Sequence, residues 1–421
     1  MNFPKIVMVK NHIPGPEAVD VPFEVRRGLE ALNLAAKVKP GQTVAITAGS
    51  RGVTDMAAAI AAVAAYFKEL GAEPFVAPAM GSHGGATDQG QEDMLAHLGI
   101  TQETIGAPVR SSMATETIGE TSFGHPVVIG RDFVRADHVV VVNRVKPHTS
   151  FRGIVESGLC KMLTIGMGKH EGAKLAHSQF YQHGFEQVVR EIAGVVMGEV
   201  PVICGVALVE NHFERTAYLQ VCGPREFMKT DAEMLEKARH LMGRVPFKQV
   251  DLLIVDEMGK NVSGSGMDSN VTGRVMNQVT PEPTERHFKR IIVRDLTPES
   301  EGNALGVGTA DFTVRRLVEK IDLHKTRVNC ITASVPEKGR IPLAYDDDQA
   351  AVTDALHTVG VDEPSEARVV WIKNTLELDR MFVSQALVEE AEAMDNISVE
   401  GELADMPFDQ EGNLPFGLFS H

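Results

Sequence analysis

The sequence is poor in basic residues and has no long apolar run, and each shortage excludes a class of protein. Its 421 residues include 41 Lys and Arg against 57 Asp and Glu, a formal net charge of -16. A nucleic-acid-binding surface needs a clustered basic face, so we expect no nucleic-acid partner. The longest apolar run, "MAAAIAAVAAYF", is too short to span a bilayer, so we expect a packed helix and no membrane partner.

The sequence also has few cysteines and no C-x-x-C pair. The four cysteines are widely spaced, at Cys160, Cys204, Cys222 and Cys330. The first residues, "MNFPKIVMVKNHIPG", lack the charged and apolar regions of a signal peptide. Both observations are typical of a reducing compartment, so we expect a cytoplasmic protein.

The length and the alternation of patterns predict two α/β domains. A chain of this length has room for two or three domains of ~150 residues each. Short β-branched runs alternate with helical patterns, which is typical of a parallel sheet covered by helices. We predict an N-terminal domain with a Rossmann-like parallel sheet over residues 1–245. We predict a second α/β domain over residues 246–421, whose tail could fold back onto the first.

The same patterns place individual elements. The predicted strands are short runs rich in β-branched residues, at residues 5–9, 43–47, 73–79, 137–142, 202–210, 250–257, 290–296, 327–333 and 367–373. The predicted helices are longer alanine-rich or amphipathic stretches, at residues 55–70, from a Thr87 cap onward, at 179–197 and at 225–242.

Four loops that follow predicted strands are rich in glycine or in reactive side chains. They are "TAGSRG" (47–52), "APAMGSHGGAT" (77–87), "NRVKPHTSFRG" (143–153) and "DEMGKNVSGSGMD" (256–268). Ligands of open α/β sheets bind beyond the carboxyl ends of the strands, so these loops predict a ligand site. The first loop can wrap a phosphate with Arg51 as a charged clamp, although a plain turn with a surface arginine explains it equally well.

Histidines gather between residues 142 and 178. His148 follows the most strongly predicted buried strand, and His170 and His177 are seven residues apart, which places them on nearly one helix face. The segment "HEGAK" has a lysine where the zinc motif H-E-x-x-H has its second histidine. A zinc site made by the protein alone is therefore weakly supported.

Several side chains also have an ordinary explanation. A lone loop histidine such as His83 is usually solvated, and Cys160 is more often a buried apolar residue than a nucleophile. We expect Lys169 and Lys174 to be solvated helix charges. Lys260 and its Gly/Ser loop suit an anionic ligand, but the loop lacks the Walker spacing, so we do not expect nucleotide hydrolysis.

Taken together, these pieces resemble the nickel-dependent lactate racemase family, in its shorter lactate racemase-like branch. The resemblance covers most of the chain and rests on an ordered set of motifs: "GSRG", "GSHGGAT", "KPHTSFRG…ESGLCKML", "KLAHS" and "DEMGKNVSGSGMDSNVTGR". It implies two α/β domains with the active site in the cleft between them. It also implies nickel held by a pyridinium-3,5-bisthiocarboxylic acid mononucleotide (nickel-pincer nucleotide), which cofactor-synthesis proteins supply.

The resemblance assigns the cofactor to five residues. Lys161 would be the attachment point, and His177 would be the nickel ligand. Arg51, with Ser50 and Gly49, would bind the cofactor phosphate. The founding racemases have Gly-Gly-Arg-Lys around the tethering lysine, whereas this chain has "GLCK", so the covalent attachment stays open.

The resemblance assigns the reaction to a second set. His83 and His148 would be the two acid/base residues, and Lys260 or Arg51 would bind the substrate carboxylate, with Glu257 beside Lys260. The lactate enzymes have Gln where Glu257 aligns, so the substrate implied is a small-molecule 2-hydroxy acid that need not be lactate.

The chemistry is consistent with these residue types. Racemising a 2-hydroxy acid by proton-coupled hydride transfer needs a group to move the hydroxyl proton on each face, and histidine titrates near working pH. Two alternatives stay open: a zinc-dependent hydrolase using the same histidines, and a non-catalytic binder of an acidic metabolite. The oligomeric state, including a homo-oligomer, also stays open.

Overall fold

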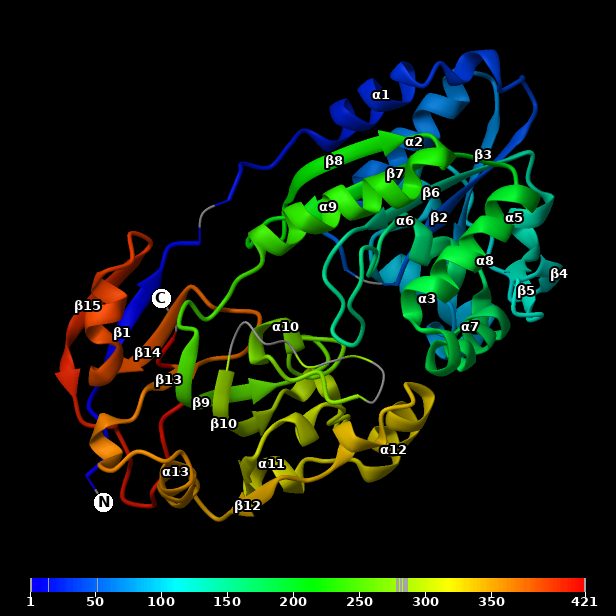
Figure 1. Ribbon diagram of the computed structural model, residues 1–421. Coiled ribbons are helices and arrows are strands. Elements are labelled where there is room, and N and C mark those ends of the chain that lie inside the picture. The colour runs from blue at the N-terminus through cyan, green and yellow to red at the C-terminus, as the bar shows by residue number, and fades with distance from the viewer. Residues whose placement is uncertain are drawn as a thin grey trace. The chain divides into compact units, whose positions relative to one another are not determined.

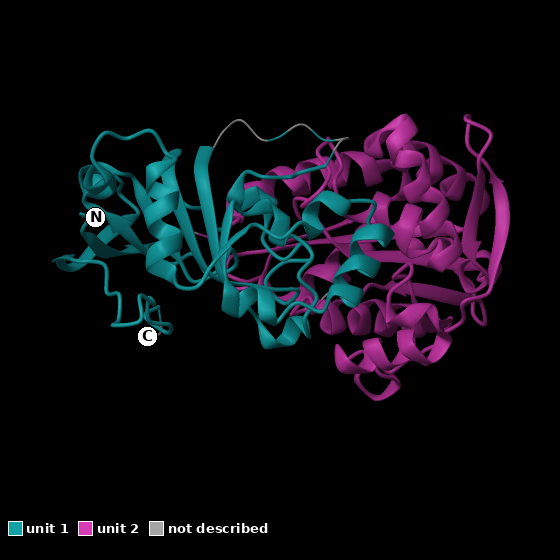
Figure 2. Ribbon diagram, turned by 90° about the horizontal axis from the view of Figure 1, so that it is seen from below, with its two compact units in different colours: residues 1–14, 243–421 teal, residues 15–242 magenta. Residues whose placement is uncertain are grey.

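The computed structural model describes residues 2–13, 15–50, 52–277, 280, 282 and 287–419. These residues form two compact units, which Figure 2 shows in magenta (residues 15–242) and teal (residues 1–14 and 243–421). Both units are α/β with parallel strands at the centre of their sheets, which confirms the predicted fold class. No described helix is long and apolar enough to cross a membrane.

The division between the units differs from the predicted one at the start of the chain. The break falls at residues 242 and 243, close to the predicted boundary after residue 245, but residues 1–14 belong to the unit formed by 243–421. Their strand β1 (Ile6–Asn11) pairs antiparallel with β14 (Arg380–Ser384) and β15 (Ile397–Ala404). The local pattern predicts this strand but not its partners, which lie at the other end of the chain.

The sheet of residues 15–242 has the strand order β3-β2-β6-β7-β8. The first four of these strands are parallel, and β8 pairs antiparallel at one edge. The strands of this sheet are β2 (Thr43–Ala48), β3 (Glu73–Pro78), β6 (His138–Arg144), β7 (Val202–Glu210) and β8 (Thr216–Cys222). A separate hairpin is formed by β4 (Thr115–Glu120) and β5 (Pro126–Gly130).

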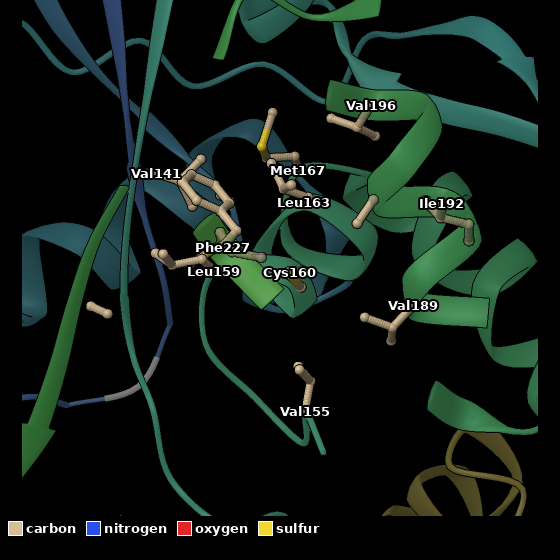
Figure 3. Close-up of a cluster of buried hydrophobic side chains, with 14 of the residues drawn as sticks. Val141, Val155, Leu159, Cys160, Leu163, Met167, Val189, Ile192, Val196 and Phe227 are labelled. Atoms are coloured by element: carbon tan, nitrogen blue, oxygen red, sulfur yellow. The ribbon is translucent and has the colours of Figure 1, made fainter. Parts of the chain in front are cut away.

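Helices cover both faces of this sheet (Figure 1). One face packs on α1 (Val21–Ala31), α2 (Met56–Glu69), α3 (Asp88–His97) and α4 (Gln102–Ile105). The other packs on α5 (Arg131–Arg135), α6 (Leu159–Lys161), α7 (Lys169–His183), α8 (Phe185–Glu199) and α9 (Phe227–Leu241). Figure 3 shows part of this second core, where Leu159 and Cys160 lie beside Phe227. The run from Val139 to Val142 is fully buried because its side chains enter the two cores alternately.

The helix predicted over residues 179–197 is two helices. Gly184 separates α7 from α8 with φ 76 and ψ 151, a backbone conformation that glycine adopts without a steric penalty. Helix α7 also begins ten residues earlier than predicted, at Lys169. It therefore contains both His170 and His177.

The second unit contains an eight-stranded mixed sheet of order β12-β11-β10-β9-β13-β14-β1-β15. Its parallel strands are β9 (Gln249–Met258), β10 (His287–Leu296), β11 (Phe312–Val314), β12 (Leu343–Tyr345) and β13 (Val369–Ile372). Its helices are α10 (Ser269–Thr272), α11 (Arg315–Glu319), α12 (Leu323–Thr332), α13 (Asp348–His357) and α14 (Val388–Glu392). The tail packs in this same unit, where the rings of Phe3 and Phe408 are 5.0 Å apart, so it does not return to the first domain.

The strand predicted over residues 327–333 is wrong, because this segment belongs to helix α12. Asp322 caps the helix by accepting hydrogen bonds from the backbone N–H groups of His324 and Lys325, both at 2.9 Å. The β-branched residues that suggested a strand point outward, since Val328 is 51% and Ile331 66% exposed. The cap lies outside the segment and outweighs its β propensity.

Candidate active site

The strand order of the first sheet indicates where a ligand would bind. The chain goes from β2 to its neighbour β3 on one side, whereas β6 lies on the other side of β2. In open α/β sheets, ligands bind beyond the carboxyl ends of the strands at such a reversal. Gly49 and Ser50 follow β2 there, and the segment leading to His148 follows β6.

Packing around Gly49 brings three segments together at this point. A Cβ atom built on Gly49 would lie 3.4 Å from Cε of Met162 and 3.9 Å from Oδ1 of Asn143. Met162 directly follows Lys161, and Asn143 lies near the end of β6. The loops after β2 and β6 therefore meet the segment that carries Lys161. The predicted clamp, Arg51, lies outside the described residues.

A buried carboxylate holds the loop of His148. Glu156 is fully buried, and its carboxylate accepts hydrogen bonds from the backbone N–H groups of His148 (2.8 Å) and Gly153 (3.2 Å). Arg239 of α9 donates to the same carboxylate at 2.9 Å. The Ser150 N–H donates to Nδ1 of His148 at 3.0 Å, so the neutral ring carries its proton on Nε2. In this arrangement His148 offers an N–H donor.

An aromatic cluster of Phe151, Phe180 and Phe185 packs beside His148. The rings of Phe151 and Phe185 are stacked with centroids 4.3 Å apart and an interplanar angle of 4°. The ring of Phe180 meets them edge-on at 5.2 and 5.0 Å. The imidazole of His148 stacks on Phe151 at 4.8 Å. These side chains thus form an apolar wall at one side of the predicted base.

Lys161 and His177 contact the same aromatic cluster. Nζ of Lys161 lies 6.0 Å from the centre of the Phe185 ring, and the ring of His177 lies 5.1 Å from that of Phe180. Burial, and then the positive charge of Lys161, lower the pKa of His177 to about 4. The imidazole is therefore neutral at pH 7, the form in which histidine binds a metal ion.

Lys161 itself is positioned by a buried aspartate. Its short helix α6 begins where Asp231 accepts hydrogen bonds from the backbone N–H groups of Leu159 and Cys160, both at 2.8 Å. Gly158 precedes the helix with φ 96, and a Cβ atom there would lie 2.2 Å from Oδ1 of Asp231. A single π-helical segment, Met162–Gly166, follows Lys161. Such segments are frequent at functional sites.

Cys160 is a buried apolar residue, as expected, and not a nucleophile. Its side chain is fully buried, with its sulfur 3.2 Å from that of Met228. Burial and the nearby Asp231 raise the pKa of the thiol far above its usual range. A thiolate does not form at neutral pH under these conditions.

The loop after β3 places His83 next to the same elements. The Gly81 N–H donates to the carbonyl of Gly166 in the π-helical segment at 3.2 Å. A Cβ atom on Gly81 would lie 3.3 Å from Cβ of Ala173 in α7. The side chain of His83 is exposed. The structure thus brings the loop of His83 against the π-helical segment that follows Lys161 and against α7, which carries His177.

Lys169 is the main surprise of this region. The expectation of a solvated charge is wrong, because Lys169 is fully buried, whereas Lys174 is exposed as expected. Burial lowers the pKa of Lys169 to about 8. The negative charges of Asp132 and Asp88 act in the opposite direction and raise it, but their effect is smaller. No pattern in the sequence distinguishes this lysine, because its burial depends on a backbone φ of 53 and on contacts with distant segments.

Glu257 and Lys260 occupy the equivalent point of the second sheet, where β9 lies between β10 and β13. Asn374, just after β13, donates to Oε1 of Glu257 at 3.1 Å. Nζ of Lys260 donates to the carbonyl of Gly264 at 2.5 Å and to Oδ1 of Asn329 at 2.9 Å. Both residues therefore lie at the carboxyl edge of their own sheet. The predicted site between the two domains stays a prediction.

The described part of the chain contains no cluster of protein side chains able to hold a metal ion by itself. Among residues 2–419, apart from the undescribed positions, no group of three or more His, Cys, Asp or Glu side chains could hold a metal ion. A zinc site made by protein ligands alone usually has three or four of them.

Comparison with known proteins agrees with this architecture. Residues 17–187 match the lactate racemase N-terminal domain, a range that contains every predicted site residue of the first unit. The fold resembles that of the lactate racemase apoprotein from Thermoanaerobacterium thermosaccharolyticum, with a TM-score of 0.54 and 13% identity, over 89% of this chain and 99% of that chain. No curated protein matches the sequence.

The chain is therefore a protein of two α/β units. Residues 17–187 are thus similar to the lactate racemase N-terminal domain, and the chain as a whole shares the fold of a lactate racemase apoprotein.

Proposed function

We propose that the protein is a racemase or epimerase of a 2-hydroxy acid that works with a nickel-pincer nucleotide. The proposal is supported by one observation: Lys161 and His177 both lie against the paired rings of Phe185 and Phe180, and burial with the charge of Lys161 lowers the pKa of His177. An amine and a single metal-binding imidazole are the two protein groups that such a cofactor requires. The lactate racemase domain match covers both residues.

The residues of this chain fit the cofactor. Two sulfur arms supply soft donors to nickel, so the protein needs to add only an imidazole, and His177 has the protonation state for this role. Lys161 would hold the organic part, and Gly49 and Ser50 would offer backbone N–H groups to the phosphate, with Arg51 as the charged clamp. When bound, the cofactor would accept the hydrogen that leaves the α-carbon and return it.

The proton transfers would be the task of two histidines. The hydroxyl proton must leave as the substrate is oxidised and return when it is reduced, and substrates of opposite configuration present this proton from opposite sides. We assign His83 and His148 to the two sides. His148 offers an N–H at Nε2, which suits the step that returns the proton. Accepting a proton at Nε2 would require the ring to release the Ser150 N–H.

Substrate orientation would come from fixed charges. Lys260 is anchored by Gly264 and Asn329, which removes much of the conformational entropy that a mobile lysine would lose on binding a carboxylate. Glu257, held by Asn374, would accept a hydrogen bond from a hydroxyl group of the substrate. Fixing the carboxylate orients the α-carbon for transfer.

The cellular setting is also a proposal. All four cysteines are buried and free, which supports a reducing cytoplasm. Proteins that make the cofactor would be needed to load this one, and we propose no nucleic-acid or membrane partner. A homo-oligomer remains compatible with the chain.

The proposal is tested by mixing cofactor-loaded protein with enantiopure 2-hydroxy acids and following optical purity. We expect loss of optical purity with at least one acid, together with bound nickel in the mass spectrum of the native protein. His177→Ala, loaded in the same way, is the matched control and should leave the acid enantiopure. Bound zinc with hydrolytic activity would support the hydrolase instead. Binding of an acid without any turnover would support the non-catalytic binder.

A further inference from the structure

Lys169 is held in the protein at an unusual energetic cost. It is fully buried and, as the first residue of α7, has a φ of 53, a left-handed value that is unfavourable for a residue with a Cβ atom. Its side chain packs closely against Gly130, where a Cβ atom would lie 3.0 Å from Cε of Lys169. Buried charges without a compensating role are rare.

The ammonium group of Lys169 contacts the start of the His83 loop. It donates a hydrogen bond to the carbonyl of Pro78, the last residue of β3, at 2.7 Å. It also donates to Oε1 of Gln91, a fully buried residue of α3, at 3.3 Å. An ammonium group can only donate, so it holds the amide of Gln91 with its oxygen toward the lysine.

This orientation directs the amide nitrogen of Gln91 toward the same loop. Nε2 of Gln91 donates to the carbonyl of Gly81 at 3.0 Å and to that of His83 at 3.2 Å. Together, Lys169 and Gln91 satisfy three backbone carbonyls between residues 78 and 83. The carbonyl of His83 also accepts from the Ala86 N–H at 3.3 Å, so the bonds to Pro78 and Gly81 supply most of the constraint. Because a buried carbonyl without a donor is costly, this pair favours one loop conformation.

The loop needs such a constraint because its own backbone is permissive. Gly81, Gly84 and Gly85 all have positive φ, between 59 and 65. Glycines in sequence allow many alternative conformations, and the free energy of ordering them must come from contacts outside the loop. Lys169 supplies such a contact from α7, the helix that carries His177 eight residues further on.

We propose that Lys169, acting through Gln91, is a positioning residue that fixes the His83 loop relative to helix α7. It does not touch the substrate. Its role is to hold a proton-transferring histidine in register with the helix of the metal ligand. The inference rests on the proposed function for its catalytic consequence, but the loop constraint itself can be measured without cofactor or substrate.

Gln91→Glu is the sharpest variant. The carboxylate still accepts from Lys169 but cannot donate to the carbonyls of Gly81 and His83. Gln89→Glu adds the same charge to an exposed position of the same helix and is the matched control. Lys169→Met, with the exposed Lys174→Met as its control, removes the ammonium group. Should Lys169→Met fail to fold, Gln91→Glu decides the question alone.

The first measurement is hydrogen exchange of the cofactor-free protein. We expect the amides of residues 79–87 to exchange about tenfold faster or more in Gln91→Glu, with the remaining core of the unit unchanged. Unchanged protection of this loop would overturn the inference, whether or not the wild-type protein is a racemase.

The second measurement is steady-state kinetics of the loaded protein. We expect kcat to fall about 100-fold, the loss typical of a misplacement of about 1 Å, while KM changes less than about twofold. A faster-exchanging loop with an unchanged kcat would overturn the catalytic part of the inference. A wild-type protein without racemase activity would instead overturn the proposed function and leave the exchange result standing.

Discussion

The ammonium group of Lys161 lies close enough to His177 to lower the pKa of its imidazole, in addition to the effect of burial. This relationship joins the short helix α6, which follows β6, to the middle of helix α7. It keeps the imidazole neutral at physiological pH, so a metal ion would not have to compete with a proton for it.

The first prediction concerns this pair. In the cofactor-free protein, NMR titration should give His177 a pKa of about 4, and Lys161→Met should raise that pKa, because it removes the positive charge. Lys174→Met, which removes an exposed lysine of the same helix, should leave it unchanged. A wild-type pKa near the ordinary value of about 6.5 would contradict the burial and charge that we describe.

The same shift has a consequence for stability. The pKa of His177 is lower in the folded than in the unfolded chain, so the unfolded chain binds more protons between pH of about 6.5 and about 4. The free energy of unfolding should therefore fall as the pH is lowered through this window. Urea unfolding at several pH values should show a smaller fall for His177→Gln than for the wild-type protein.

The second prediction concerns the two proton-transferring histidines. His83→Ala and His148→Ala should each lower the racemisation rate of the loaded protein by about 10²–10⁴-fold, the usual contribution of a general acid or base. His170→Ala, which removes an exposed histidine of α7, should have little effect. Circular dichroism should show the same fold in all three variants. If either site variant retains more than about a tenth of the rate, its assigned role is wrong.

The third prediction separates the two cofactor contacts. Lys161→Ala should abolish any covalent adduct, whereas His177→Ala should lose nickel but keep the organic part of the cofactor. Intact-protein mass spectrometry and metal analysis measure these two properties independently of activity. An adduct that persists without Lys161 would move the attachment point elsewhere, and nickel that persists without His177 would exclude it as the ligand.

The fourth prediction concerns the buried carboxylate behind His148. Glu156→Gln should lower the free energy of unfolding by roughly 1–3 kcal/mol, because Glu156 accepts from two backbone N–H groups and from Arg239, and an amide oxygen cannot replace all three. Racemisation should fall as well, since the loop of His148 is held by these bonds.

A matched control for this variant exists on the same arginine. Arg239 also pairs with Glu236, whose side chain is 61% exposed, and exposed pairs contribute little. Glu236→Gln should therefore change the unfolding free energy by no more than about 0.5 kcal/mol. Equal losses of unfolding free energy in Glu156→Gln and Glu236→Gln would show that only the ion pairs with Arg239 contribute. The backbone hydrogen bonds that Glu156 accepts would then contribute nothing measurable.

Much of the first unit can be predicted from local patterns. The run at residues 139–142 is apolar on both faces and forms the central strand β6, and the Thr87 cap begins α3 through a hydrogen bond from the Gly90 N–H at 3.1 Å. Strands with glycine-rich loops after them also indicate the ligand-binding edge of the sheet. Each of these features depends on residues that are neighbours in sequence, so the pattern contains the information.

Other features depend on contacts between distant residues. The strand β1 has a clear local pattern, yet its sheet is decided by β14 and β15 near the other end of the chain. The β-branched segment at residues 327–333 becomes helical because Asp322, just outside it, caps the helix. Glycine at position 184 divides one predicted helix into two.

By itself, the sequence determined the α/β class, the loops that carry reactive side chains and the motifs that resemble those of lactate racemases, because these are properties of short segments. Only the tertiary structure decided that Lys169 is buried, that Lys161 depresses the pKa of His177 and that Glu156 holds the loop of His148. Burial and charge coupling depend on which segments pack together, and no local pattern contains that information.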